Sequence, residues 1–236
     1  MTLTEFLEAN LAELPEAAKK RLQETYGLDD YTATVIAGDP PAIRLYDQAV
    51  LTAQEQLNLS QHDKSLAKTV AKFLCNDLFA LIRDDQEQRR AREGEEVSST
   101  ATTSGDEEVY SKVNGPQLGE LVAMLQEEFI STTQAKKILT ILYQEESTFG
   151  LSPRELAQQR GLQLITDANQ LEQLCRETIE QFPEQLEQYK KGGKHVIKMK
   201  KFLVGKAMAL SRGNAHPERI HEALEEVLEE VAPGVE

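Results

Sequence analysis

The sequence predicts an all-α protein, with a helical bundle domain followed by a small helical tail domain. Two observations predict this fold class. Apolar residues recur every three or four positions over windows longer than a typical strand, and prolines and glycines stand where helices favour a beginning or an end. A chain of 236 residues, 40% of them hydrophobic, is long enough for one large domain or two small ones.

The first half of the chain predicts five successive helices. Apolar stripes and start signals place them at about 3–11, 15–27, 30–38, 39–59 and 66–81. Pro15 and Pro40 are expected in first turns, where a helix makes no use of the missing N–H. Asp30 and Asp39 are candidate N-caps. The strongest apolar stripe, from Leu66 to Leu81, predicts a central helix of the bundle.

A disordered insertion is predicted at about 86–113. This segment begins with Arg and Glu residues, continues with Ser and Thr, and ends with acidic residues. Such a composition buries too little apolar surface to offset the entropy lost when a chain is ordered. We therefore expect a tether rather than a binding or catalytic site.

Helical periodicity resumes after the insertion. The predicted helices lie at about 118–125, 135–142, 152–161, 167–179, 182–193, 194–212 and 217–231, with an extended joint at 162–165. Asp167 is a candidate N-cap. Gly213 and Pro217 separate the last two helices in the expected order, a glycine at a C-terminus and a proline at an N-terminus. We expect a helical domain at 1–161, which includes the insertion, and a compact tail domain at 162–236.

Composition and charge exclude several classes of protein. No apolar run approaches the roughly 20 residues that a membrane span needs. The first fourteen residues carry acidic and no basic side chains, unlike a signal or transit peptide. Cys75 and Cys175 are too far apart for a disulfide framework or a paired-cysteine zinc site, and the histidines lack metal-ligand spacing. We expect a cytoplasmic protein without a metal, with mitochondria as the alternative for a eukaryotic source.

One window of the chain is basic although the formal net charge is −14. Eight Lys or Arg residues and no Asp or Glu lie between positions 190 and 212. In a helix that begins at Lys194, one strip opposite the apolar face contains Lys194, Lys198, Lys201, Gly205, Ala209 and Arg212. Lys200 projects toward the apolar side, where its stem is expected to run along the apolar surface.

The residues alone leave two interpretations of this strip open. Lysines beside Gly205 and Ala209 would let a phosphodiester backbone approach the helix closely while they neutralise its charge. Alternatively, the strip is a solvated face, and Gly205 lets a neighbouring helix come close. The strip lacks aromatic residues on which single-stranded bases could stack, so a folded RNA fits it better than an unstructured one.

No catalytic constellation accompanies the strip. Gly192-Gly193-Lys194 looks like the end of a P-loop, but the earlier Gly and the Ser or Thr after the Lys are missing. We find no nucleophile elbow, no Ser-His-Asp arrangement and no paired metal carboxylates in the sequence. The acidic last helix is interpreted as an amphipathic packing helix.

The basic region also resembles a known family. Its segments Lys201-Phe202-Leu203-Val204-Gly205-Lys206-Ala207-Met208 and Arg212-Gly213-Asn214-Ala215-His216-Pro217 are similar to the signature of the GatB/YqeY domain. This domain is the C-terminal tail of the GatB subunit of the glutamine-dependent aspartyl/glutamyl-tRNA amidotransferase. Weaker matches in the same order, such as Leu14-Pro15-Glu16-Ala17 and Gly161-Leu162, extend the resemblance over nearly the whole chain outside the insertion. Lys206 and Ala209 depart from the Gln and Lys of the family pattern.

The resemblance implies a tail that holds the outer, elbow region of a misacylated tRNA while another domain performs the chemistry. In that family, the catalytic part of the GatB subunit uses ATP and Mg²⁺ and receives ammonia from an amidase subunit, and nothing in this sequence resembles it. A similar tail also occurs fused to some glutaminyl-tRNA synthetases and as a stand-alone protein.

We therefore predict a non-catalytic tRNA-binding module of, or derived from, the GatB subunit of the amidotransferase. Its partners would be tRNA and the catalytic subunits of the amidotransferase, without DNA, a membrane, or a cofactor held in this chain. The predicted tRNA-binding residues are Lys190, Lys191, Lys194, Lys198, Lys201, Gly205, Lys206 and Arg212. The alternative is a helical protein-interaction adaptor that does not bind RNA, and a complete enzyme is the third hypothesis.

Overall fold

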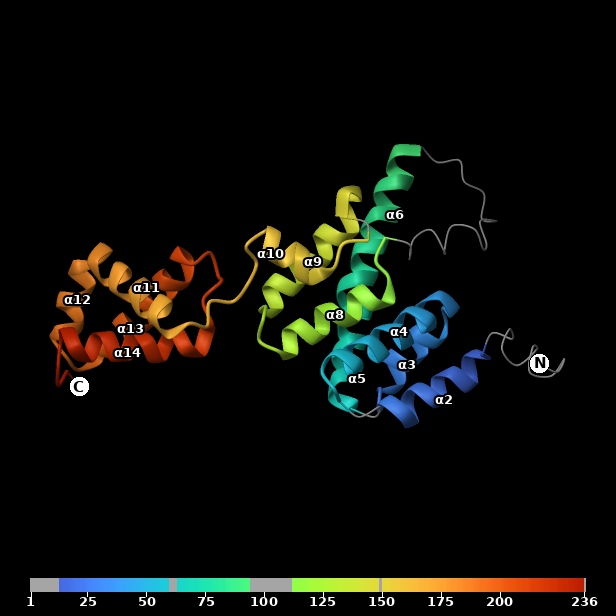
Figure 1. Cartoon of the computed structure of the whole chain (residues 1–236), viewed down its shortest axis with the longest axis horizontal. Helices are drawn as coiled ribbons and strands as arrows, with labels where there is room; N and C mark the ends of the chain where they lie inside the picture. The colour runs from blue at the N-terminus through green and yellow to red at the C-terminus, as the bar shows by residue number, and fades with distance from the viewer. Residues whose placement is uncertain (1–12, 60–62, 94–111, 149, 236) are drawn as a thin grey trace. The chain divides into compact units, whose positions relative to one another are not determined.

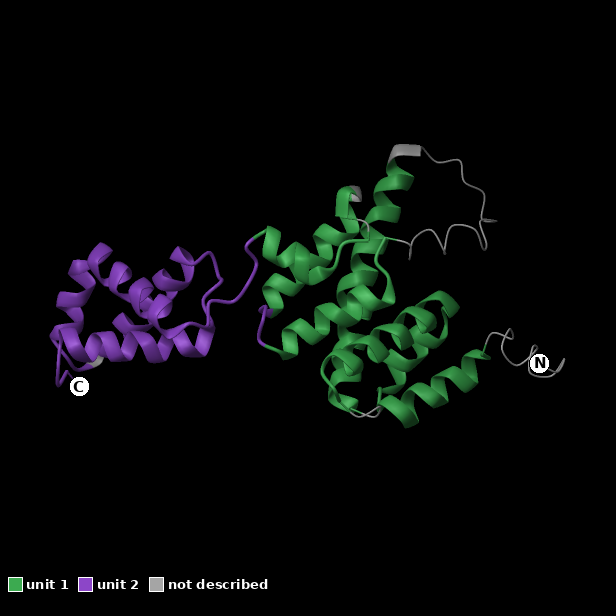
Figure 2. Cartoon of the chain, in the orientation of Figure 1, with its two compact units in different colours: residues 1–127, 132–160 green, residues 128–131, 161–236 purple. Residues whose placement is uncertain are grey.

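The structure is a computed structural model of the chain and describes residues 13–59, 63–93, 112–148 and 150–235 (Figure 1). In these residues every regular element is a helix, and the only β-structure is one isolated β-bridge. This confirms the predicted all-α fold class. The chain divides into two compact units (Figure 2). Unit 1 comprises residues 1–127 and 132–160, and unit 2 comprises residues 128–131 and 161–236. The helix predicted at 3–11 lies outside the described residues.

The helices of unit 1 begin at polar caps or prolines that the sequence supplies. They are α2 (Pro15–Tyr26), α3 (Asp30–Ala37), α4 (Pro40–Gln56), α5 (Lys64–Lys72), the π-helical η1 (Phe73–Leu78), α6 (Phe79–Glu93), α8 (Gly115–Gln126), α9 (Thr132–Gln144), the 3₁₀ turn η2 (Glu146–Thr148) and α10 (Pro153–Gln159). Asp29, not Asp30, caps α3, because its side chain accepts a hydrogen bond from the Thr32 amide. Asn114 and Ser152 form capping boxes at α8 and α10. The single helix predicted over 66–81 instead contains the π-helical segment η1.

Helices α4 and α8 pack closely in the core of unit 1 because α8 carries glycine at the contact. A Cβ atom on Gly119 would lie 2.4 Å from the Ala49 carbonyl oxygen and 2.9 Å from the Thr52 Cβ. Tyr46, about one turn before Ala49 on α4, and Leu118, next to Gly119 on α8, are fully buried. Glycine at position 119 therefore permits the approach of two backbones, a role that only a residue without a side chain can fill.

The structure describes residues at both ends of the predicted insertion, and there they differ from the prediction. Residues 86–93 belong to α6, so the prediction of disorder is wrong there. Charged and amide side chains with good helix propensity, together with an ion pair one turn apart between Arg89 and Asp85, favour the helix. At the other end, Val113 is buried, and the Lys112 Nζ donates to Asp85 Oδ2 at 2.8 Å. The remaining part, 94–111, lies outside the described residues.

Unit 2 contains α11 (Ala168–Gln181), α12 (Pro183–Lys190), α13 (Lys194–Leu210) and α14 (Pro217–Val231). Their inner faces form one apolar cluster that includes Leu171, Cys175, Leu203, Leu224 and Leu228. The predicted joint at 162–165 is not helical, and its last residue, Ile165, forms a parallel bridge with Ala215. This bridge attaches the segment before α11 to the loop between α13 and α14.

Candidate nucleic-acid interface

Helix α13 has one buried and one exposed face, as its sequence predicts. Met199, Leu203 and Ala207 are buried in the apolar cluster of unit 2. Lys198, Lys201 and Gly205 are exposed. We call these three residues the α13 basic face. The side chain of Lys194, which is predicted to belong to the same strip, lies outside the described part of the structure.

The lysines of the α13 basic face are available to an external ligand. In the described part of the chain, no ion pair or hydrogen bond involves the side chain of Lys198 or Lys201. Other cations of unit 2 are paired, such as Arg176, which contacts both Glu172 and Glu230. The amino groups of Lys198 and Lys201 therefore remain open to water, where they can exchange counterions for phosphate groups.

Two further lysines of the basic window are engaged with carboxylates. Lys190 Nζ lies 2.8 Å from Glu187 Oε1 within α12. Lys200 Nζ lies 2.9 Å from Glu225 Oε1 on α14, and this hydrogen bond raises the pKa of Lys200. The predicted packing helix α14 thus also neutralises one lysine of α13. It leaves Lys198 and Lys201 unpaired, and Lys191 is exposed without an ion pair among the described residues.

Lys206 differs from the α13 basic face because it contacts aromatic rings. Its Nζ lies 5.2 Å from the ring centroid of Phe182 and 5.3 Å from that of Phe202. The two rings pack edge to face, with centroids 5.5 Å apart. A half-buried lysine above two ring faces gains cation–π attraction. Lys206 therefore helps to hold the start of α12 against α13, a contact that the sequence pattern did not predict.

Gly205 faces open space. No atom of another element lies within 4 Å of the position that its Cβ would occupy, so among the described residues it does not serve the approach of a neighbouring helix. The interpretation that Gly205 lets a neighbouring helix come close is therefore wrong for the described residues. Glycine inside a helix costs about 1 kcal/mol relative to alanine. An exposed helical glycine without an internal packing role is compatible with close approach of an external backbone.

Arg212 is not on the strip where helical projection placed it. The helix ends at Leu210, and Arg212 has a left-handed backbone with φ of 55°. Its amide donates to Ala209 O at 3.0 Å, and the Gly213 amide donates to Met208 O at 2.8 Å. These two bonds form a Schellman motif, in which the position of Arg212 usually holds glycine. The prediction fails here because it extended the helix through the cap.

We expect the substitution Arg212→Gly to stabilise unit 2 and to weaken any RNA binding that uses this side chain. Glycine adopts the left-handed conformation without the steric cost of about 1 kcal/mol that arginine carries. Thermal unfolding measures the first effect and titration with tRNA the second. Arg212→Lys is the control, because it keeps both the charge and the strain. If Arg212→Gly raised the melting temperature and left tRNA affinity unchanged, Arg212 would not be a contact.

Among the described residues, the possible metal ligands are dispersed and the two thiols are at least partly buried. No set of three or more His, Cys, Asp or Glu side chains is placed to hold a metal ion in this part of the chain. Burial raises the pKa of both the Cys75 and the Cys175 thiols to about 11. Each thiol is therefore protonated at neutral pH and a poor nucleophile. Within the described ranges, no helix has the length and apolar character to cross a membrane.

The chain matches a known protein family over most of its length. The family model described as the GatB domain matches residues 57–228, which include all of α13. This match confirms the resemblance found in the sequence.

Several curated relatives that match most of the chain are B subunits of the aspartyl/glutamyl-tRNA(Asn/Gln) amidotransferase. That of Halorhodospira halophila is 29% identical over 227 residues, which is 96% of this chain and 40% of the relative. That of Methylacidiphilum infernorum is 28% identical over 220 residues, 93% of this chain and 37% of the relative. That of Alkalilimnicola ehrlichii is 29% identical over 228 residues, 97% of this chain and 40% of the relative. The chain thus spans about 40% of the length of these relatives and corresponds to their C-terminal part.

Proposed function

Because the chain belongs to the GatB domain family, we propose that it is a tRNA-binding module related to the GatB subunit of the amidotransferase, without catalytic groups of its own. Family membership supports a role related to this subunit, and the relatives' names refer to tRNA.

The observation that carries the proposal is the α13 basic face. Two unpaired, exposed lysines accompany a glycine whose Cβ position is open, on a protein with 40 acidic and 26 basic residues. A solvated face in such a protein is expected to mix both signs of charge. A face that presents only positive charge and allows close approach to the helix backbone suits a polyanion with regularly spaced phosphates.

The proposed mechanism is electrostatic capture. Lys198 and Lys201 neutralise phosphates of a folded tRNA, and counterions released from the tRNA supply the free energy. The acceptor end of the tRNA is then processed by partner subunits of the amidotransferase.

Titration of the purified chain with unfractionated tRNA at several salt concentrations tests the proposal. We expect log Kd to rise linearly with log salt concentration, with a slope of about 0.7 to 0.9 for each phosphate contact. A double-stranded DNA of similar length, titrated in the same way, serves as the comparison that separates binding of a folded tRNA from binding of any polyanion. Absence of salt-dependent tRNA binding would contradict the proposal.

The adaptor hypothesis predicts a protein partner instead of RNA. Exposed apolar side chains such as Tyr31, 77% exposed, are groups that such a partner would contact. An adaptor would retain its protein partners after nuclease treatment of a pull-down, whereas a tRNA-mediated association would disappear. A complete enzyme would convert misacylated Glu-tRNA in the presence of glutamine or ammonia without other subunits. We expect no such conversion by this chain alone.

A further inference from the structure

We propose that Lys64, Lys68 and Lys72 of α5 form a second surface that binds the ribose–phosphate backbone of RNA. We call these residues the α5 lysine row. The inference rests on the proposed function, because it assigns a second contact, on unit 1, to the same class of ligand. It depends on residues that play no part in the α13 basic face.

The row is a continuous cationic face of one helix. The three lysines follow each other at intervals of four residues and are all exposed, whereas Leu66 and Val70 of the same helix are buried. No acidic residue occurs from 64 to 76. Residues four apart lie on the same side of a helix, so the three lysine side chains start from one side of α5, away from the buried face of Leu66 and Val70.

The charges of the row are not balanced within the protein. Among the described residues, no ion pair or hydrogen bond involves the side chains of the three lysines. Other cations of unit 1 do find carboxylates, including Lys19, Arg21, Lys112 and Lys136. Like charges four residues apart destabilise a helix by about 0.2–0.5 kcal/mol per pair. An acidic protein that leaves this repulsion uncompensated has a surface suited to an external anion.

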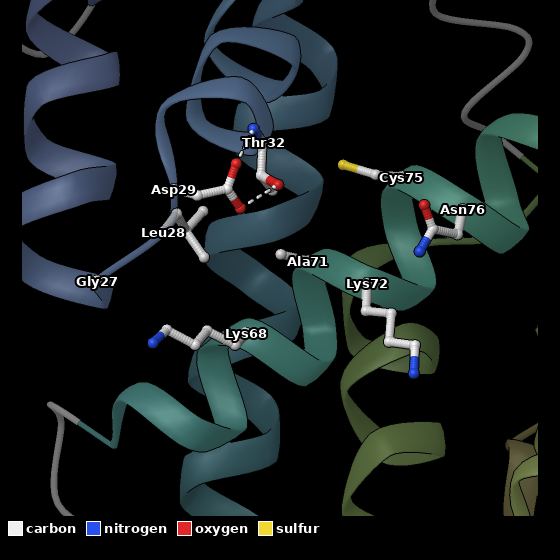
Figure 3. A pocket seen from close by; sticks show the side chains of 9 residues that line it. All are labelled: Gly27, Leu28, Asp29, Thr32, Lys68, Ala71, Lys72, Cys75 and Asn76. Carbon is white, nitrogen blue, oxygen red and sulfur yellow. Dashed lines mark hydrogen bonds between the residues drawn. The ribbon is translucent and has the colours of Figure 1, made fainter.

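A cavity beside the row favours an extended polyanion over a single small anion. Lys68 and Lys72 line a cavity of about 450 Å³, together with Thr32 and Asn76 (Figure 3). The side chains of Lys68 and Lys72 extend in different directions rather than toward one point (Figure 3). Their backbone positions are separated by about 6 Å along the helix axis, four residues at about 1.5 Å each. In this arrangement, each of the two diverging amino groups can meet a different phosphate of one strand, which suits an extended polyanion better than one small ion.

The other polar groups of the cavity define which part of the ligand can enter it. Asp29 accepts hydrogen bonds from the Thr32 amide at 3.0 Å and the Thr32 hydroxyl at 2.7 Å. Its negative charge, on the α3 side, keeps phosphates on the lysine side of the cavity. The exposed amide of Asn76 can donate to or accept from a ribose 2′-hydroxyl, a group that distinguishes RNA from DNA.

The test compares two charge-matched triple variants of the full chain. In the first, Lys64, Lys68 and Lys72 are replaced by Gln, and in the control, Arg83, Arg90 and Lys137, which are exposed and unpaired cations of the same unit in the described structure, are replaced by Gln. Both variants lose three positive charges. Unfractionated tRNA is titrated into each at several salt concentrations, and circular dichroism verifies that each is folded.

For each phosphate contact removed, we expect the row variant to bind tRNA about fivefold more weakly at about 0.1 M salt, with a log–log salt slope shallower by about 0.7. The control variant is expected to keep the slope of the unmodified chain. Equal behaviour of the two variants would overturn the inference. If the row variant kept full affinity and variants of the α13 basic face bound no tRNA, the inference alone would fail. If no variant changed tRNA binding, the proposed function would fail as well.

If the row variant did not fold, single replacements of Lys68 and Lys72 would be measured in the same way. Each changes one exposed side chain without a partner among the described residues, so each is expected to fold. A change in slope of about 0.7 for each single variant would support the inference, and unchanged slopes would overturn it.

Discussion

Replacement of Lys194, Lys198 and Lys201 by Glu is expected to weaken tRNA binding by more than about 100-fold without unfolding the chain. Removal of each phosphate contact reduces affinity about fivefold at about 0.1 M salt, and each new carboxylate adds repulsion. Lys198 and Lys201 form no ion pair or hydrogen bond whose loss would destabilise unit 2 in the described structure. Titration with tRNA and thermal unfolding, performed on the same preparations, measure the two parts of this prediction.

The control for this variant changes the same number of charges elsewhere. Arg83, Arg90 and Lys137, replaced by Glu, alter the net charge equally but lie in unit 1 and outside both basic surfaces. We expect only a modest loss of affinity from the more negative protein as a whole. If the control weakened tRNA binding as strongly as the α13 variant, net charge rather than a specific face would explain the binding.

Substitution of Gly205 by Ala is expected to stabilise the protein and, at the same time, to weaken tRNA binding. Alanine favours a helix over glycine by about 1 kcal/mol, and its methyl group meets no other element among the described residues. The same methyl group would stand between the helix backbone and a closely approaching phosphate. We expect a higher melting temperature together with a reduced tRNA affinity.

The matched contrast is Gly119→Ala, at the packed contact of α4 and α8. A methyl group there collides with backbone atoms, so we expect destabilisation of about 1–3 kcal/mol, measured by chemical denaturation. The two glycines therefore predict opposite shifts in stability for the same substitution. If Gly205→Ala raised stability and left tRNA affinity unchanged, the proposed close approach of RNA to Gly205 would be wrong. The proposed contacts of Lys198 and Lys201 would not be affected by this result.

Much of the fold could be predicted from the sequence because its signals are local. Pro15, Pro40, Pro153 and Pro217 each mark the first turn of a helix in the structure, as expected from the fixed backbone of proline. The exposed positions of Lys198, Lys201 and Gly205 follow from helical periodicity alone. The two-faced character of α13 was therefore accessible without coordinates.

The remaining features depend on contacts between distant residues or on details of helix ends. The pairing of Lys200 with Glu225 and the packing of Lys206 on Phe182 join residues far apart in the chain, which periodicity within one helix cannot reveal. Arg212 leaves the strip because the helix ends two residues earlier than the apolar pattern indicates. Gly213, whose amide donates the second hydrogen bond of the Schellman motif, is the residue in the sequence that marks the end of α13.

The most direct measurement of the central claim is the rate at which individual lysines are acetylated with and without bound tRNA, read by mass spectrometry. If the α13 basic face holds the RNA backbone, tRNA will protect Lys198 and Lys201 strongly while Lys137, exposed in unit 1, reacts at its original rate. Equal acetylation of Lys198 and Lys201 in the free protein and in a saturated tRNA complex would contradict the claim.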